Sequence, residues 1–153
     1  MKTDCIFKKE DFESSDGMLT YVWGPSLWHF LHTMSFNYPV KPICNEKKYY
    51  MNFIYSLENI LPCKYCRDNL KRNLKETGFS IKKLKNRYTF SKYIYDLHNH
   101  INKMLNKNTK ISYNEVRNRY ENFRSRCSEK QKVKHFKTKK VSLNKNNKKC
   151  LNN

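Results

Sequence analysis

The segment FSKYIYDLHNHINKML, residues 90–105, decides the fold class of this chain. Its apolar residues recur every three or four positions, which is the period of an amphipathic α-helix. They are Phe90, Tyr93, Ile94, Leu97, Ile101, Met104 and Leu105. This is the longest clean stripe in the sequence, and it predicts a long helix with one face turned toward a core.

Three segments upstream repeat the same period. The first is capped by Ser26 and stopped by Pro39, and the second runs over residues 45–60. The third begins at a cysteine pair and ends at Gly78, because glycine readily adopts the backbone conformation that terminates a helix. A shorter helix is expected downstream, over residues 112–126. Since no alternating run typical of strands occurs, the sequence predicts an all-α fold, a four-helix bundle with a short fifth helix.

The two ends of the chain lack this period. Residues 1–19 are polar and are expected to form a loose N-terminal arm, whereas residues 128–153 contain nine Lys and one Glu and are expected to form a basic flexible tail. Residues 20–127 remain as one folded domain of the 153-residue chain. No apolar run reaches the ~18 residues of a membrane helix, and the N-terminus is too polar for a signal peptide. We therefore expect a soluble protein that is not secreted and has no membrane partner.

The formal net charge is +19, from 32 Lys and Arg against 13 Asp and Glu. Such a charge usually suggests nucleic acid or an anionic surface as partner. However, 25 of the 32 cations are Lys, whereas base and phosphate recognition favours Arg. The chain also has no Ala and 19 Asn, which a coding bias toward AT explains. The composition therefore argues against a nucleic-acid partner, and a basic α-helical nucleic-acid-associated module is kept only as an alternative.

One close cysteine pair, Cys63-Lys-Tyr-Cys66, stands at the start of the third expected helix. A helix N-terminus favours a thiolate, so the pair predicts a redox-active dithiol. A zinc-binding module is a further alternative, and it needs two more ligands. Cys44 has no cysteine or histidine partner nearby, and His98 and His100 would point about 200° apart around a helix. A metal site is therefore not favoured.

Two histidines lie on apolar helix faces. His32 follows Trp28 by four residues in the first helix, and His98 precedes Asn102 by four in the fourth. A single polar residue on such a face is most often a hydrogen-bonded core residue. Two helices that each present a histidine inward, together with a redox dithiol, fit better with a polar cofactor inserted into the bundle.

Three sequence blocks then follow one another in order. They are WGPSLWHFLH at residues 23–32 with Tyr38-Pro39 after it, LPCKYC at residues 61–66, and LHNHIN at residues 97–102 with Leu105 and Lys107 after it. Together they resemble the Erv/ALR family of flavin-dependent sulfhydryl oxidases, over roughly residues 20–127. The short chain and its composition look most like the versions encoded by large DNA viruses.

The resemblance implies a bundle that holds FAD non-covalently, usually as a homodimer. Enzymes of this family take two electrons from a substrate dithiol and pass them through FAD to molecular oxygen, which gives a disulfide and hydrogen peroxide. By position, Cys66 is the cysteine next to the flavin ring, and Cys63 is the outer cysteine that exchanges with the incoming thiol. The implied partners are thiol-containing protein substrates or a small redox protein, in a host cytoplasm or a virion.

The resemblance also assigns residues to the flavin pocket, and it implies no metal. Tyr120 stands where the family usually has a Trp that covers the adenine. The implied cofactor-binding residues are Gly24, Pro25, Trp28, His32, Phe36, His98, Asn102, Lys107, Arg119 and Tyr120. Many relatives carry a second cysteine pair that acts as a shuttle. This sequence has no second such pair, so substrate dithiols are expected to reach Cys63 directly.

Overall fold

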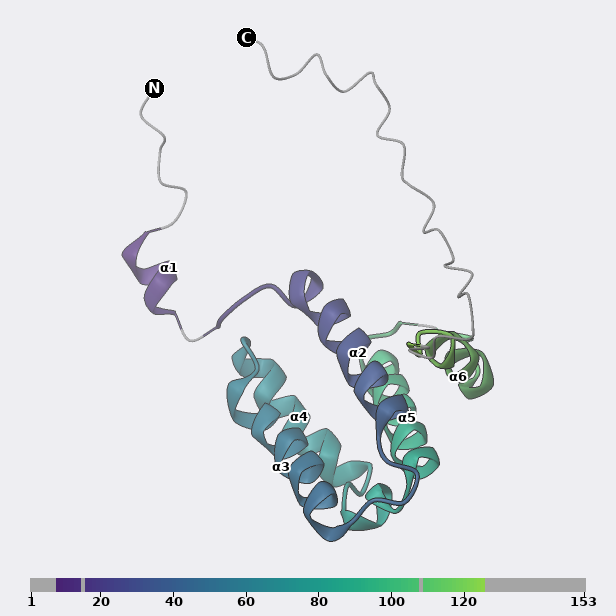
Figure 1. The fold of residues 1–153 in the computed structure, drawn as a ribbon. Coiled ribbons are helices and arrows are strands. Elements are labelled where there is room, and N and C mark those ends of the chain that lie inside the picture. The colour runs from purple at the N-terminus through teal and green to yellow at the C-terminus, as the bar shows by residue number, and fades with distance from the viewer. Residues whose placement is uncertain (1–7, 15, 108, 126–153) are drawn as a thin grey trace, which may run out of the picture. The chain divides into compact units, whose positions relative to one another are not determined.

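Helices make up the regular structure of the described part of the chain, which comprises residues 8–14, 16–107 and 109–125 of a computed structural model. In chain order they are α1 (Lys9–Glu13), α2 (Thr20–Asn37), α3 (Cys44–Ile60), α4 (Lys64–Glu76), the 3-10 helix η1 (Ile81–Leu84), α5 (Arg87–Met104) and α6 (Tyr113–Glu121) (Figure 1). Described residues up to Phe123 belong to one compact unit, and Arg124 and Ser125 belong to a second.

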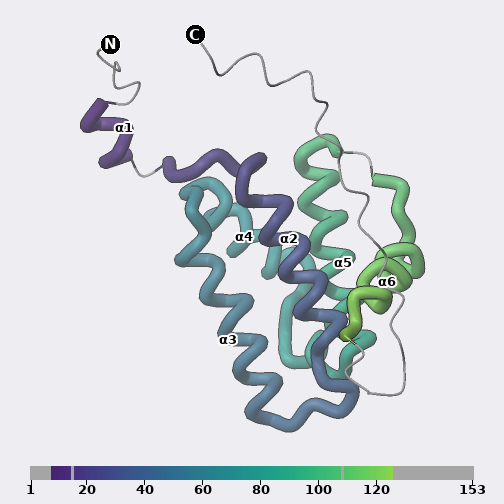
Figure 2. Tube along the Cα trace, turned by 45° about the horizontal axis from the view of Figure 1, so that its top comes forward, coloured from purple at the N-terminus to yellow at the C-terminus, as the bar shows by residue number. Residues whose placement is uncertain are grey.

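The four long helices pack as two neighbouring pairs. α2 lies against α5 and α3 lies against α4, while α4 also contacts α5, so the pairs share one core (Figure 2). The short helix α6 contacts both α2 and α5. The predicted all-α four-helix bundle with a short fifth helix is therefore confirmed. Two short elements, α1 and η1, are additional to the expected helices, and each is a single turn or little more.

The core is apolar and is closed at one end by a buried tyrosine. Tyr38 is fully buried, and its ring packs edge-on against Tyr50 (4.6 Å between centroids) and Phe90 (5.0 Å). Its hydroxyl donates to the Leu84 carbonyl oxygen at 2.9 Å, and its carbonyl oxygen accepts from Arg87 Nε at 2.5 Å. These two bonds tie the end of α2 to the segment that enters α5.

The expectation that Ser26 caps the first long helix is wrong. α2 begins six residues earlier at Thr20, and Pro25 lies inside it. Pro25 has no N–H to give to the Tyr21 carbonyl four residues before it. Since Tyr21 is exposed, water can hydrate this carbonyl, and the helix tolerates the proline. The indole N–H of Trp23 donates to the Met18 carbonyl oxygen at 3.0 Å, which fixes the chain ahead of the helix.

Except at the end of α6, the other expected helix ends agree with the structure to within a few residues. α4 ends at Glu76, and Gly78 follows with a φ of +64°, the left-handed conformation expected of a helix-terminating glycine. α6 begins at Tyr113 after the Ser112 cap, whose hydroxyl accepts the Glu115 N–H at 3.3 Å. α6 ends at Glu121, earlier than expected.

The segment expected as a loose arm is more ordered where it approaches α2. Asp16 to Met18 pair with Pro62 to Lys64 through an isolated antiparallel bridge between Gly17 and Cys63. The expected flexible tail, residues 128–153, lies outside the described residues. Within the described residues, no helix is both long and apolar enough to cross a bilayer.

Candidate functional site

The cysteine pair forms a disulfide at the N-terminus of α4. The two Cα atoms of Cys63 and Cys66 are 5.2 Å apart, within the range that a disulfide spans. Cys63 is the N-cap residue of α4, and its Sγ accepts the backbone N–H of Cys66 at 3.2 Å. A helix N-terminus stabilises negative charge, so this position favours a thiolate on Cys63 after reduction. The structure thus brings the pair together at the helix start, as the sequence predicted.

The two sulfurs differ in their surroundings. Cys63 is only 9% exposed, whereas Cys66 is half-buried and packs against the apolar core. The backbone of Asp16 to Met18 runs alongside Cys63. Arg67 donates from Nη1 to the Leu61 carbonyl oxygen at 2.6 Å, which fixes a positive charge at the turn before α4. The Cys63–Cys66 disulfide therefore lies in a largely covered position at the N-terminal end of α4.

Two histidines from neighbouring helices face each other inside the bundle. His32 on α2 and His98 on α5 approach to 3.0 Å between Nε2 and Nδ1, so one ring donates and the other accepts. Trp28 stacks on His98 with ring centroids 4.0 Å apart and an interplanar angle of 6°. The inward placement of both histidines that the sequence predicted is therefore confirmed.

Both imidazoles are held neutral by their environment. Burial, then the proximity of His98 and His29, lowers the pKa of His32 from 6.5 to about 3. Burial, then the positive charge of Lys107, lowers the pKa of His98 from 6.5 to about 4. At neutral pH the pair therefore offers hydrogen-bonding groups without a charge. His32 Nδ1 is buried and has no hydrogen-bond partner among the described residues, so it is available to a polar group that enters the site.

α6 adds an aromatic wall to this pair. The Tyr120 ring stacks on Phe36 (5.5 Å between centroids, 7° between planes) and lies 5.1 Å from His32. Its hydroxyl is 3.3 Å from Nδ1 of His29. Trp28, His32, Phe36, His98 and Tyr120 thus form one cluster, which we call the aromatic cluster. The contact between His29 and Tyr120 depends on how α6 packs against α2, which residue periodicity does not determine.

The remaining predicted residues lie around the cluster with fewer contacts. Asn102 is buried on α5, and its carbonyl oxygen accepts the Lys107 N–H at 2.8 Å. The Lys107 side chain lines a hollow of about 400 Å³ together with Lys103. Gly24 and Pro25 lie on α2 one turn before Trp28, and Arg119 is exposed on α6 next to Tyr120. Of these residues, Lys107 lies close enough to His98 for its charge to lower the pKa of that imidazole, and Arg119 precedes Tyr120 on α6.

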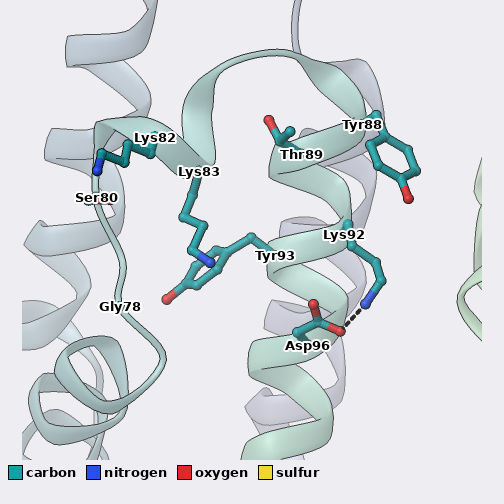
Figure 3. Close-up of a pocket in the computed structure, with 9 residues that line it drawn as sticks. All are labelled: Gly78, Ser80, Lys82, Lys83, Tyr88, Thr89, Lys92, Tyr93 and Asp96. Carbon is teal, nitrogen blue, oxygen red and sulfur yellow. Dashed lines mark hydrogen bonds and ion pairs between the residues drawn. The ribbon is translucent and has the colours of Figure 1, made fainter.

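A second hollow, of about 480 Å³, is lined by none of the predicted residues. Figure 3 shows Lys83 reaching toward the Tyr93 ring, with Nζ 5.7 Å from its centroid, and Lys92 paired with Asp96. Part of the positive charge of this hollow is therefore already compensated. Across the described ranges, no three His, Cys, Asp or Glu side chains are grouped closely enough to hold a metal ion.

Comparison with known proteins connects these features to a family. The sequence model of the Erv1 / Alr family matches residues 25–137. An FAD-linked sulfhydryl oxidase of African swine fever virus is 32% identical over 99 residues, which are 65% of this chain and 80% of that protein. A "probable FAD-linked sulfhydryl oxidase" of Acanthamoeba polyphaga mimivirus is 32% identical over 80 residues, 52% of this chain and 56% of that protein. The match therefore spans about half the length of the mimivirus protein.

The fold of the chain is also similar to a solved structure of this family. The crystal structure of the yeast Erv1 core superposes with a TM-score of 0.62 at 22% identity, covering 82% of this chain and 98% of that chain. Neither the zinc-binding nor the nucleic-acid alternative finds support among these matches. The helical bundle, the dithiol at the start of α4 and a family match over more than half of the sequence agree, and the chain belongs to the Erv1/Alr family.

Proposed function

We propose that this chain is an FAD-dependent thiol oxidase that forms disulfides in protein substrates. The observation that carries the proposal is the Cys63–Cys66 disulfide at the N-terminus of α4. A disulfide at a helix N-terminus can accept electrons from a dithiol, because the sulfur at the cap is stabilised as a thiolate. The FAD-linked names of the relatives support the choice of cofactor.

The aromatic cluster is the part of the bundle that fits FAD. Its rings offer flat faces for stacking, and the buried, unpartnered Nδ1 of His32 can form a hydrogen bond to a polar edge. FAD supplies a two-electron acceptor that molecular oxygen can reoxidise to give hydrogen peroxide. The residues proposed to hold it are Trp28, His32, Phe36, His98 and Tyr120 in the cluster, with Gly24, Pro25, Asn102, Lys107 and Arg119 around it.

The two cysteines have different roles in the proposed thiol exchange. A substrate thiolate attacks Sγ of Cys63, the Cys63–Cys66 bond breaks, and Cys66 leaves as a thiolate beside the core. The second substrate thiolate then attacks the substrate sulfur of this mixed disulfide and releases Cys63. The N–H of Cys66 stabilises the departing Cys63 thiolate, and a stabilised thiolate leaves faster. The products are a substrate disulfide and the reduced Cys63 and Cys66 pair as two thiolates, so the exchange between two substrate thiolates and the protein disulfide releases no proton.

Purified full-length protein tests the proposal. We expect yellow protein that consumes oxygen in the presence of dithiothreitol, and we expect Cys63→Ser and Cys66→Ser to abolish this turnover. Cys63→Ser should retain its flavin. Cys44→Ser is the matched control, because Cys44 is a free, exposed cysteine and its replacement should leave the rate unchanged. Colourless protein, or full turnover by Cys63→Ser, would contradict the proposal.

The family also suggests the bounds of the domain, the oligomeric state, the electron acceptor and the substrates of this chain. We take residues 20–127 as the oxidase domain, and we expect a homodimer, molecular oxygen as electron acceptor, and thiol-containing proteins or a small redox protein as substrates. The viral relatives support a host cytoplasm or a virion as the site of action.

A further inference from the structure

Residues 62–64, around Cys63, form backbone hydrogen bonds with residues 16–18. The Met18 N–H donates to the Pro62 carbonyl oxygen at 2.5 Å, and the Lys64 N–H donates to the Asp16 carbonyl oxygen at 3.4 Å. We call residues 62–64 the docking segment and residues 16–18 the resident segment. The two bonds flank Gly17 and Cys63, which therefore face each other as the non-hydrogen-bonded pair of an antiparallel bridge.

This kind of pair places opposite side chains close together. The Cα atoms are typically about 4.5 Å apart, inside the ~4.4–6.8 Å that a disulfide spans. A cysteine in the place of Gly17, on an ordinary extended backbone, would therefore lie within disulfide reach of Cys63. The resident residue is glycine, which has no side chain to react or to occupy the space in front of Cys63.

Glycine at this position is also required for the close approach. Gly17 has a φ of +80°, and a Cβ built on it would lie 2.3 Å from the Pro62 carbonyl oxygen. The resident segment is held by its two backbone bonds and by the Trp23 indole N–H on the Met18 carbonyl. Each such bond adds only a small net contribution to stability, because water satisfies the same groups when the bond is broken. An incoming chain that makes the same two backbone bonds with residues 62–64 therefore offsets the loss of the bonds that the resident segment makes there.

We propose that the docking segment recognises an extended stretch of the substrate protein, which displaces the resident segment and presents its cysteine opposite Cys63. This inference rests on the proposed thiol oxidase function. Recognition through backbone groups is tolerant of substrate sequence. The neighbouring side chains Leu19, Ile60 and Tyr65 are apolar and exposed, which favours substrates with apolar residues near the cysteine.

A trapping experiment on the flavin-loaded, full-length Cys66→Ser variant tests the proposal. The probe is a five-residue peptide with β-branched residues around one cysteine, activated as its mixed disulfide with thionitrobenzoate. The Cys63 thiolate attacks the peptide sulfur, a Cys63–peptide disulfide forms, and coloured thionitrobenzoate leaves as a thiolate. The variant with both Cys63→Ser and Cys66→Ser gives the background rate of the other cysteines.

N-methylation of the probe separates backbone docking from simple thiol exchange. In the proposed pairing, the residue after the cysteine donates its N–H to Pro62, whereas the N–H of the cysteine itself points away from the docking segment. We expect N-methylation of the residue after the cysteine to slow capture by roughly three- to tenfold. N-methylation of the cysteine is the matched control and should change the rate by less than about twofold.

A protein variant tests the displacement. Gly17→Ala should loosen the resident segment and speed capture several-fold, because Cβ would collide with Pro62. Gly78→Ala is its control, since Gly78 also has a positive φ but has open space around its Cα. Equal capture of the two methylated peptides, or no acceleration by Gly17→Ala, would overturn the proposal. Wild-type oxidation of dithiothreitol is measured alongside, and its absence would instead overturn the proposed function.

Discussion

Acid should destabilise this chain through the His32 and His98 pair. Burial lowers the pKa of His32 to about 3 and that of His98 to about 4, from 6.5. In the unfolded chain both histidines return to their ordinary pKa. Between about pH 6.5 and about pH 4 the unfolded chain therefore binds protons that the folded chain does not. The free energy of unfolding is then highest above about pH 6.5 and falls as the pH falls.

The size of this loss of stability follows from the protonation of the two histidines in the unfolded chain. At about pH 5, a histidine with an unfolded pKa of 6.5 is 1.5 units below that pKa, which stabilises the unfolded chain by about 2 kcal/mol. Both folded pKa values lie below 5, so the folded chain gains almost nothing in return. The pair should lower the free energy of unfolding by about 4 kcal/mol between about pH 8 and about pH 5, somewhat less for the half-buried His98.

Urea unfolding at several pH values measures this loss. His98→Gln keeps a polar partner for His32 and removes one titrating ring, so the loss between about pH 8 and about pH 5 should shrink by about 2 kcal/mol. His32→Gln should do the same. The difference between variant and wild type cancels the contribution of all other titrating groups. If both variants lost as much stability in acid as the wild type, the two rings would not be buried and neutral as described.

Three further results are expected. Tyr38→Phe leaves the buried Leu84 carbonyl without its donor and should lower the free energy of unfolding by about 1–3 kcal/mol in urea titrations, whereas Tyr49→Phe, at an exposed ring, should change it by less than about 0.5 kcal/mol. Tyr120→Ala removes the ring of the aromatic cluster that stacks on Phe36 and should weaken FAD retention roughly two- to tenfold on dialysis, with Tyr120→Phe close to wild type. Truncation after Cys127 should leave both the flavin spectrum and dithiothreitol oxidation intact, and loss of flavin would show that residues 128–153 belong to the fold.

The sequence could predict the helices because their apolar periods are local and unbroken. The stripe from Phe90 to Leu105 became α5, and the cysteine pair opened α4, where Cys63 accepts its own cap bond. The start of α2 could not be predicted from the apolar period. Proline usually breaks a helix, but α2 continues through Pro25, where the Tyr21 side chain is exposed and the Trp23 indole is bound to the Met18 carbonyl oxygen.

Contacts between segments that are distant in the chain could not be predicted from local sequence patterns. The pairing of Gly17 with Cys63 joins residues 46 positions apart, and no local sequence pattern predicts it. One signal was present: the chain has only three glycines, and Gly17 lies in a polar stretch where nothing else requires one. The contact of His29 with Tyr120 likewise depends on the packing of α6, which residue periodicity does not determine.

The cap of α4 also explains how this corner can change its redox state without changing its shape. Sγ of Cys63 already accepts the Cys66 N–H while it is part of the disulfide. A thiolate at the same atom accepts the same N–H more strongly, because a charged acceptor strengthens a hydrogen bond. The first turn of α4 therefore keeps its cap whether the two sulfurs are joined or separate. In the proposed thiol exchange, the same cap bond is therefore available to α4 before and after the disulfide opens.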